Sequence, residues 1–136
     1  MVSMNSIIFY KEITMKKIQS SGAPDAIGPY SQGFVTNGLI FTSGQLPVNS
    51  ETGEIPEGIA AQTEQSCKNV LAILEAAGSG AEKVVKTTCF LAEITDFSAF
   101  NEVYAKYFVS KPARSCFAVK ALPKEALCEI ECVAKA

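Results

Sequence analysis

Residues 82–109 read EKVVKTTCFLAEITDFSAFNEVYAKYFV, and the hydrophobic period changes in the middle of this stretch. Its first half, 82–94, is apolar and rich in β-branched residues, which predicts a strand. Its second half, 97–109, predicts a helix with an apolar side made of Phe97, Phe100, Val103, Tyr104 and Tyr107. Asp96 precedes this helix as a plausible N-cap. A strand followed at once by a helix predicts helices packed on a sheet.

The segments before this stretch supply a hairpin and a longer helix. Residues 33–45 predict a β-hairpin, because apolar runs flank the turn pair Asn37-Gly38. Residues 15–20 predict a short first strand, and turn-rich loops follow both. Residues 59–80 predict a helix, which Gly78 and Gly80 would end. Its apolar stripe is Ile59, Thr63, Cys67, Val70, Leu71, Leu74 and Ala77.

The segments after it supply two more strands. Pro112 ends the second helix, and residues 113–122 and 127–136 predict strands joined by PKEA. The order β-ββ-α-β-α-β-β predicts an α+β fold, a mostly antiparallel six-stranded sheet with two helices on one face. The other face of such a sheet stays uncovered. If that face is apolar, an oligomer is expected.

Length and composition predict one soluble domain over residues 15–136. The chain has 136 residues, nearly half of them hydrophobic, and a net charge of -2. That charge argues against broad electrostatic binding to nucleic acid. No apolar run approaches the length of a membrane-spanning helix. Residues 1–14 fit neither a secretory signal nor a transit peptide, and we interpret them as a mobile extension or an alternative start before Met15.

The sequence has five cysteines and no histidine. The cysteine spacing matches neither a zinc ribbon nor a redox motif, so we expect mostly reduced core thiols in a reducing compartment. The expected location is the cytoplasm, with a mitochondrial form left open. The lack of histidine removes the usual general base, the usual metal ligand and a Ser-His triad. Any chemistry must use other side chains and water.

Each of the last two predicted strands carries charged residues on one of its two faces. Side chains alternate along a strand, so Arg114 and Cys116 point the same way, as do Glu129 and Glu131. We hypothesise that Arg114 meets one of the two glutamates in a single cleft. The alternative is a structural ion pair, or charges on a solvated face.

Two loops and one helix position add polar residues that are candidates for the site. Tyr30 follows Gly-Pro in a rigid turn, and Ser43 with Gly44 stands at a strand exit, where backbone N–H groups and a hydroxyl are expected to be free. Asn101 lies on the second helix. Taken singly, each of these residues is more often structural than functional.

In order and spacing, several motifs together resemble the RidA family, also called the YjgF or L-PSP family. They are IGPYSQG, FTSGQLP followed by TGEIPEG, NVLAILEAAGSG, VVKTTCFLAEITDFSAFNEVYAKYF, KPARSCFAV and ALPKEALCEIECVA. The resemblance runs from about Met15 to the C-terminus. The arginine strand and the glutamate of the last strand resemble the branch of the family that acts as a deaminase.

The resemblance implies a chorismate-mutase-like fold and a homotrimer with three clefts between subunits. It also implies hydrolysis of reactive 2-imino acids or their enamine tautomers, such as 2-aminoacrylate and 2-iminobutanoate, to 2-oxo acids and ammonia. These substrates are by-products of pyridoxal-phosphate enzymes. No cofactor and no metal are expected, and neither a membrane nor nucleic acid is an expected partner.

The resemblance also implies roles for single residues. Arg114 would bind the substrate carboxylate with two parallel hydrogen bonds, for which lysine is no substitute. Glu129 would orient the attacking water and act as base or proton shuttle. It is chosen over Glu131 from the family pattern and not from strand parity. Cys116 would line the pocket without acting as a nucleophile, because an imine already reacts with water.

The remaining candidates would shape and polarise the cleft. Backbone groups near Ser43 and Gly44, together with Cys116, would polarise the imine nitrogen. Tyr30 and Asn101 would close the cleft by hydrogen bonds. Phe97 would supply an apolar wall.

Two other functions remain open from the sequence. One is RNA cleavage with inhibition of translation, which is also reported for this family and which salt-sensitive RNA binding would favour. The sequence lacks a basic stripe and an aromatic RNA-recognition motif. The other is a non-catalytic trimer that binds small carboxylates or acts like a chaperone. Binding through Arg114 without turnover would identify it.

Overall fold

A computed structural model describes residues 15–136, so the expected extension over 1–14 lies outside the described residues. The strands are β1 (Lys16–Ile18), β2 (Gly33–Thr36), β3 (Leu39–Thr42), β4 (Val84–Leu91), β5 (Ala113–Ala118) and β6 (Cys128–Lys135). The helices are α2 (Ile59–Ala76) and α3 (Phe97–Tyr107), with short 3-10 turns at Ala81–Lys83, Ile94–Asp96 and Pro123–Glu125. The predicted order of elements and the α+β class are therefore confirmed.

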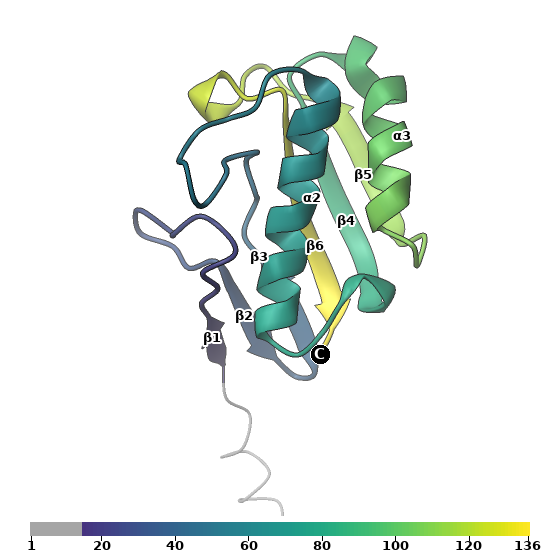
Figure 1. The fold of residues 1–136 in the computed structure, drawn as a ribbon. Helices are drawn as coiled ribbons and strands as arrows, with labels where there is room; N and C mark the ends of the chain where they lie inside the picture. The colour runs from purple at the N-terminus through teal and green to yellow at the C-terminus, as the bar shows by residue number, and fades with distance from the viewer. Residues whose placement is uncertain (1–14) are drawn as a thin grey trace, which may run out of the picture.

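The six strands form one sheet in the order β1-β2-β3-β6-β4-β5. Neighbouring strands are antiparallel except β4 and β5, which are parallel. Helix α3 connects β4 to β5, as a crossover between parallel neighbours requires. Both helices lie on the same face of the sheet (Figure 1).

The hydrophobic core lies between the helices and this inner face. Alternation along each strand turns every second side chain inward. The fully buried members include Ile40, Cys67, Val70, Ile73, Leu74, Cys89, Leu91, Phe100, Cys128 and Ile130. The predicted stripe of α2 is correct at Thr63, Cys67, Val70 and Leu74, but Asn69 is also buried. Its amide donates to the carbonyls of Leu46 and Val48, which ties the loop after β3 to the helix.

The turn between β2 and β3 forms where the sequence predicts it. Asn37 and Gly38 have φ angles of 50° and 74°, the left-handed conformation that a two-residue hairpin turn needs. Two other predictions need correction. Strand β5 ends at Ala118 and not at residue 122, because Ala118 pairs with Leu91, the last residue of β4. Asp96 precedes α3 with φ −83° and ψ −1°, and its side chain makes no capping hydrogen bond, because a 3-10 turn already leads into the helix.

The outer face of the sheet carries large apolar side chains. Leu39, Phe41 and Phe117 are 36%, 44% and 44% exposed in the single chain. The Phe117 ring also meets the Phe90 ring edge-on at 5.5 Å. An exposed apolar face of this kind is typical of an interaction surface. None of the helices within residues 15–136 is long and apolar enough to cross a membrane.

Candidate functional site

Arg114 lies on the inner, helix-covered face of the sheet near its edge. In the parallel pairing of β4 with β5 it stands beside Thr87. Its side chain reaches α3, where Nη1 donates to Oδ1 of Asn101 at 2.7 Å. Its Cζ atom lies 4.8 Å from the centre of the Tyr104 ring and 5.5 Å from that of Phe97. A guanidinium at these distances from two rings makes favourable cation–π contacts.

The three α3 residues around Arg114 follow a helical row. Phe97, Asn101 and Tyr104 are separated by four and three residues, so they lie on one side of the helix. Arg114, Asn101 and Tyr104 help to line a cavity of about 490 Å³. We call Arg114, Cys116, Phe97, Asn101 and Tyr104 the arginine half-site.

Cys116 is half-buried two residues beyond Arg114 on the same face. It pairs in register with Cys89 of β4. Burial raises the pKa of the Cys116 thiol, although the Arg114 charge and a hydrogen bond with Cys89 oppose this. A thiol with a raised pKa is mostly protonated near neutral pH and is a poor nucleophile. The geometry therefore agrees with a lining role for Cys116.

Glu129 and Gly44 lie together on the opposite side of the molecule. The segment after β3 continues beside β6, because Gln45 and Ile130 exchange two backbone hydrogen bonds of 2.7 and 3.2 Å. This places Gly44 so close to Glu129 that a Cβ atom at position 44 would collide with the Glu129 carboxylate. We call Glu129, Gly44, Ser43 and Tyr30 the acid half-site.

Ser43 does not have the free groups that the sequence predicts. Its N–H donates to the carbonyl of Gln32 at 2.8 Å, and its hydroxyl donates to the carbonyl of Ser31. Both bonds fix the strand exit against the loop that carries Tyr30. Within residues 15–136, the N–H of Gly44 has no hydrogen-bond acceptor. That N–H is therefore the backbone donor that the acid half-site can offer to a ligand.

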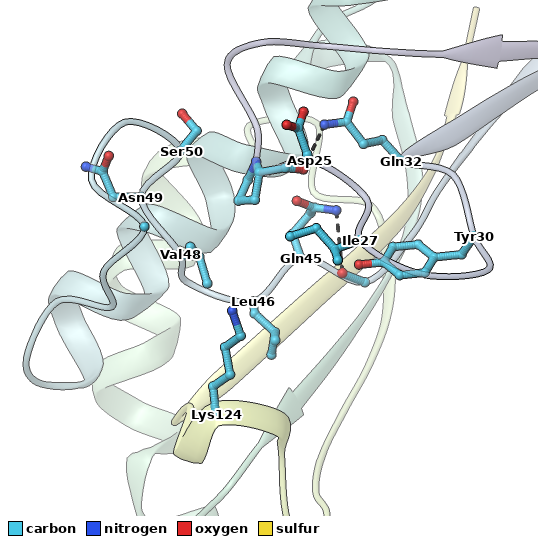
Figure 2. A pocket seen from close by; sticks show the side chains of 13 residues that line it. Asp25, Ile27, Tyr30, Gln32, Gln45, Leu46, Val48, Asn49, Ser50 and Lys124 are labelled. Carbon is cyan, nitrogen blue, oxygen red and sulfur yellow. Dashed lines mark hydrogen bonds between the residues drawn. The ribbon is translucent and has the colours of Figure 1, made fainter.

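A cavity of about 460 Å³ opens beside Gly44. Tyr30 projects its hydroxyl end toward Ile27 and Gln45 on one side, and Lys124 reaches up beside Leu46 from another (Figure 2). Its walls are Pro24, Asp25, Ile27, Tyr30, Gln32, Gly44, Gln45, Leu46, Val48, Asn49, Ser50, Gly53 and Lys124. Tyr30 is 55% exposed in the single chain. The structure therefore brings the predicted residues Tyr30 and Gly44 to one cavity.

The Glu129 carboxyl has a raised pKa. Partial burial is the larger cause, and the negative charge of Glu131 on the same strand face adds to it. Both effects disfavour the charged form. A carboxyl whose pKa moves toward neutral can both accept and return a proton, which suits an acid–base group.

The expectation that Arg114 and a glutamate face one cleft is wrong for a single chain. Arg114 stands beside Thr87, and Thr87 stands beside Cys132, so all three point to the inner face. Glu129 stands beside Phe90, which points to the outer face. Strand parity alone could not show this, because it does not reveal which face of each strand the helices cover. The two half-sites can meet only if two copies of the chain come together.

Tyr104 belongs to the site but was predicted only as part of the apolar side of the second helix. Its hydroxyl lies 2.6 Å from that of Thr87, and its ring faces Arg114. The available signal was its spacing from Asn101, a residue already singled out, by three positions. Among residues 15–136, no group of three or more His, Cys, Asp or Glu side chains is placed to hold a metal ion.

Known proteins resemble this chain over most of its length. The sequence model of a family described as endoribonuclease L-PSP matches residues 20–136. A relative from Lactococcus lactis, named as a regulator AldR, is 52% identical over 123 residues, which cover 89% of this chain and 98% of its own. The 2-iminobutanoate/2-iminopropanoate deaminase of Escherichia coli K12 is 48% identical over 123 residues, covering 88% and 96%.

A solved structure extends the likeness to three dimensions. The crystal structure of Escherichia coli TdcF with bound serine is 43% identical, covers 89% of this chain and 98% of its own, and has a TM-score of 0.86. The fold is therefore shared over almost the whole of the described residues.

Proposed function

This chain belongs to the endoribonuclease L-PSP family, and from that premise we propose that it hydrolyses reactive 2-imino acids to 2-oxo acids and ammonia. The substrates are 2-imino acids and their enamine tautomers, released by pyridoxal-phosphate enzymes. The deaminase of Escherichia coli, 48% identical over 123 residues, is named for this reaction. The observation that carries the proposal is Arg114, held between Asn101, Tyr104 and Phe97 at the edge of a cavity.

Arg114 binds the substrate carboxylate. A guanidinium has five N–H donors, and here one nitrogen already donates to Asn101. The remaining N–H groups can form two parallel hydrogen bonds with a planar carboxylate. The partly buried position strengthens these charge-assisted bonds, because less water competes for them. Every 2-imino acid has this carboxylate, whatever its side chain.

Glu129 transfers the protons of the reaction. Its carboxylate takes a proton from water while the water oxygen bonds to the imine carbon and the C=N π electrons move to nitrogen. Glu129 then returns that proton to the nitrogen of the tetrahedral intermediate. Glu129 next takes the proton of the new hydroxyl group and passes it to the amino nitrogen. Ammonia then leaves with the C–N electrons, while the oxygen lone pair freed by that deprotonation forms the C=O bond. The N–H of Gly44 is available to donate to the imine nitrogen.

The complete site forms between subunits. Two observations support this inference: Arg114 and Glu129 point to opposite faces of one sheet, and the outer face exposes Leu39, Phe41 and Phe117. Joining the arginine half-site of one copy to the acid half-site of the next is a head-to-tail contact, and such a contact generates a ring when the rotation between copies closes. A ring of three copies would hold three such sites, as the family resemblance implies.

A coupled assay tests the reaction. Threonine dehydratase generates 2-iminobutanoate, semicarbazide competes for it, and release of 2-oxobutanoate is followed with and without the protein. We expect the wild-type protein to accelerate release. Arg114→Ala, Arg114→Lys and Glu129→Gln should each lower kcat/KM by about tenfold or more. Glu102→Gln, at an exposed carboxylate of α3, is the control and should retain full activity.

Two results would contradict the proposal. One is the absence of acceleration with imines generated from both threonine and serine. The other is full activity in Arg114→Ala. Binding of 2-oxobutanoate through Arg114 without any turnover would instead identify a protein that only binds small carboxylates.

RNA cleavage is the second candidate, because the family is described by that activity. The same preparations test it with a fluorescently labelled RNA at several salt concentrations. Cleavage that falls with rising salt and is lost in an Arg114 or Glu129 variant would support it. Cleavage that persists unchanged in both variants would point to a contaminating nuclease.

A further inference from the structure

Two buried hydroxyl groups beneath Arg114 have no part in the proposed chemistry. We propose that Tyr104, anchored by Thr87, is a positioning residue that fixes the direction of the Arg114 guanidinium before substrate binds. The inference rests on the proposed function, because it assigns Arg114 the substrate carboxylate. Neither Tyr104 nor Thr87 needs to touch the substrate.

The contact between the two hydroxyls is short and enclosed. Tyr104 Oη and Thr87 Oγ1 are 2.6 Å apart. Tyr104 is 8% exposed and Thr87 is fully buried. Thr87 is also the in-register neighbour of Arg114 across β4 and β5. The strand residue beside the arginine therefore holds the ring on which the guanidinium rests.

Arg114 needs such a support because its side chain is long and has many rotamers. Freezing it only when substrate arrives would cost side-chain entropy at that moment. Asn101 holds one nitrogen of the guanidinium at 2.7 Å, which leaves rotation about that contact. The Tyr104 ring, 4.8 Å from Cζ, and the Phe97 ring, 5.5 Å away, restrict this rotation. Together they preorganise the fork that binds a carboxylate.

The position of the Tyr104 ring is itself fixed from two sides. Its ring stacks on Phe100 at 5.7 Å and on Phe108 at 4.6 Å. Stacking leaves the ring some freedom to slide, and the bond to Thr87 removes it. Burial raises the pKa of Tyr104 to about 12. The phenol therefore keeps its proton and its bond to Thr87 throughout the pH range of an activity assay.

The chain offers an unusually direct test, because Arg114 is its single arginine. In a protein labelled with ¹⁵N-arginine, one Nε–H signal reports the surroundings of this guanidinium, and its line shape reports rotation of the group. The variants are Thr87→Val, Tyr104→Phe and Thr87→Ser. The control is Thr63→Val, which removes a fully buried hydroxyl from α2 that donates to the Ile59 carbonyl.

We expect Thr87→Val and Tyr104→Phe to shift the Arg114 signal and to speed rotation of the guanidinium. Both should raise KM for 2-iminobutanoate by about threefold to tenfold with little change in kcat, because they weaken binding of the carboxylate in ground and transition states alike. Thr87→Ser keeps a hydroxyl and should restore both readouts. Thr63→Val should lower stability and leave the Arg114 signal and KM as in the wild type.

Several results separate this inference from its alternatives. The inference is overturned if both Thr87→Val and Tyr104→Phe leave the Arg114 signal and KM unchanged. The bond between Tyr104 and Thr87 would then be only a structural hydrogen bond of the core. If Thr87→Val does not fold, Tyr104→Phe still decides, because it keeps the ring and removes only the hydroxyl. If the wild-type protein shows no imine hydrolysis, the proposed function fails, while the Arg114 signal still shows whether Thr87 and Tyr104 position the arginine.

Discussion

Gly44 leaves room for the Glu129 carboxylate. A Cβ atom at position 44 would overlap Oε1 of Glu129 and lie 2.9 Å from its Cδ atom, so the flexible end of the glutamate would have to move. We therefore expect Gly44→Ala to lower kcat by about tenfold or more while the protein stays folded, because a general base must keep hydrogen-bond reach of its water. The coupled imine assay and a urea unfolding curve measure the two effects.

The chain provides a matched control for this substitution. A Cβ atom at Gly80 would also meet a glutamate carboxylate, because it would lie 2.9 Å from Oε2 of Glu82. Glu82 is exposed, and neither residue belongs to a half-site. Gly80→Ala should retain full activity. Equal loss of activity in both variants would mean that Gly44→Ala acts through general destabilisation and not through Glu129.

Glu131 adjusts the proton affinity of its neighbour. Burial, and then the Glu131 charge, raise the pKa of Glu129. Glu131→Gln removes the like charge and should lower that pKa. If deprotonated Glu129 is the base, the acidic limb of the pH profile of kcat/KM moves to lower pH, and activity under acidic conditions rises. The pH profile of Glu102→Gln is the reference. An acidic limb that does not move in Glu131→Gln would show that a group other than Glu129 determines its position.

The same shift has a consequence for stability, and its sign follows from linkage. Because the folded pKa of Glu129 is raised, this group favours the folded state most below its unfolded pKa. That contribution is lost as the pH rises through the folded pKa. Glu131→Gln should weaken this loss, since it brings the folded pKa of Glu129 closer to its unfolded value.

Among the elements, the β2–β3 hairpin depends most on a single backbone conformation. Gly38 has φ 74°, and a Cβ atom there would meet nothing within 4 Å, so the cost of a side chain comes from the backbone alone. We expect Gly38→Ala to lower the free energy of unfolding by about 1 kcal/mol. Urea unfolding measures it, and an unchanged or raised midpoint would contradict it. KM should not change, because the turn lies away from both half-sites.

The sequence predicts these elements well because their signals are local. Asn37-Gly38 sets the hairpin, and a change of period separates β4 from α3. The end of β5 could not be predicted in this way, because it depends on where its partner β4 stops at Leu91. The prediction of a free hydroxyl at Ser43 was wrong for a similar reason. The carbonyl that accepts its hydrogen bond belongs to Ser31, in another segment of the chain.

The candidate site was predictable as a set of residues but not as an arrangement. Strand alternation correctly places Arg114 with Cys116 and Glu129 with Glu131. Which of these pairs lies beneath the helices depends on the pairing of β5 and β6 with β4, and no local pattern encodes that pairing. Tyr104 was missed as a site residue because a buried aromatic at helical spacing is usually core, and here it is both core and support for Arg114.

At the scale of the whole molecule, the outer sheet face is expected to hold the subunits together. Phe41 lies on this face and is 44% exposed in the single chain. Phe41→Glu would bury a charge at a subunit contact and should dissociate the assembly. Sedimentation measures the mass, and activity should fall with it. Ile94→Glu, at a 55% exposed position between β4 and α3, is the control. A Phe41→Glu protein with unchanged mass would exclude this face from the contact.

Because Arg114 and Glu129 point to opposite faces of the sheet, we expect two different inactive variants to complement each other. If each site takes its arginine from one subunit and its glutamate from the next, two different inactive chains can repair each other. In a ring of three that mixes Arg114→Ala with Glu129→Gln subunits, one junction joins an intact arginine to an intact glutamate. Random mixing of equal amounts should restore roughly a quarter of wild-type activity. Two defective alleles would thus complement each other, whereas a site built within one chain would allow no recovery.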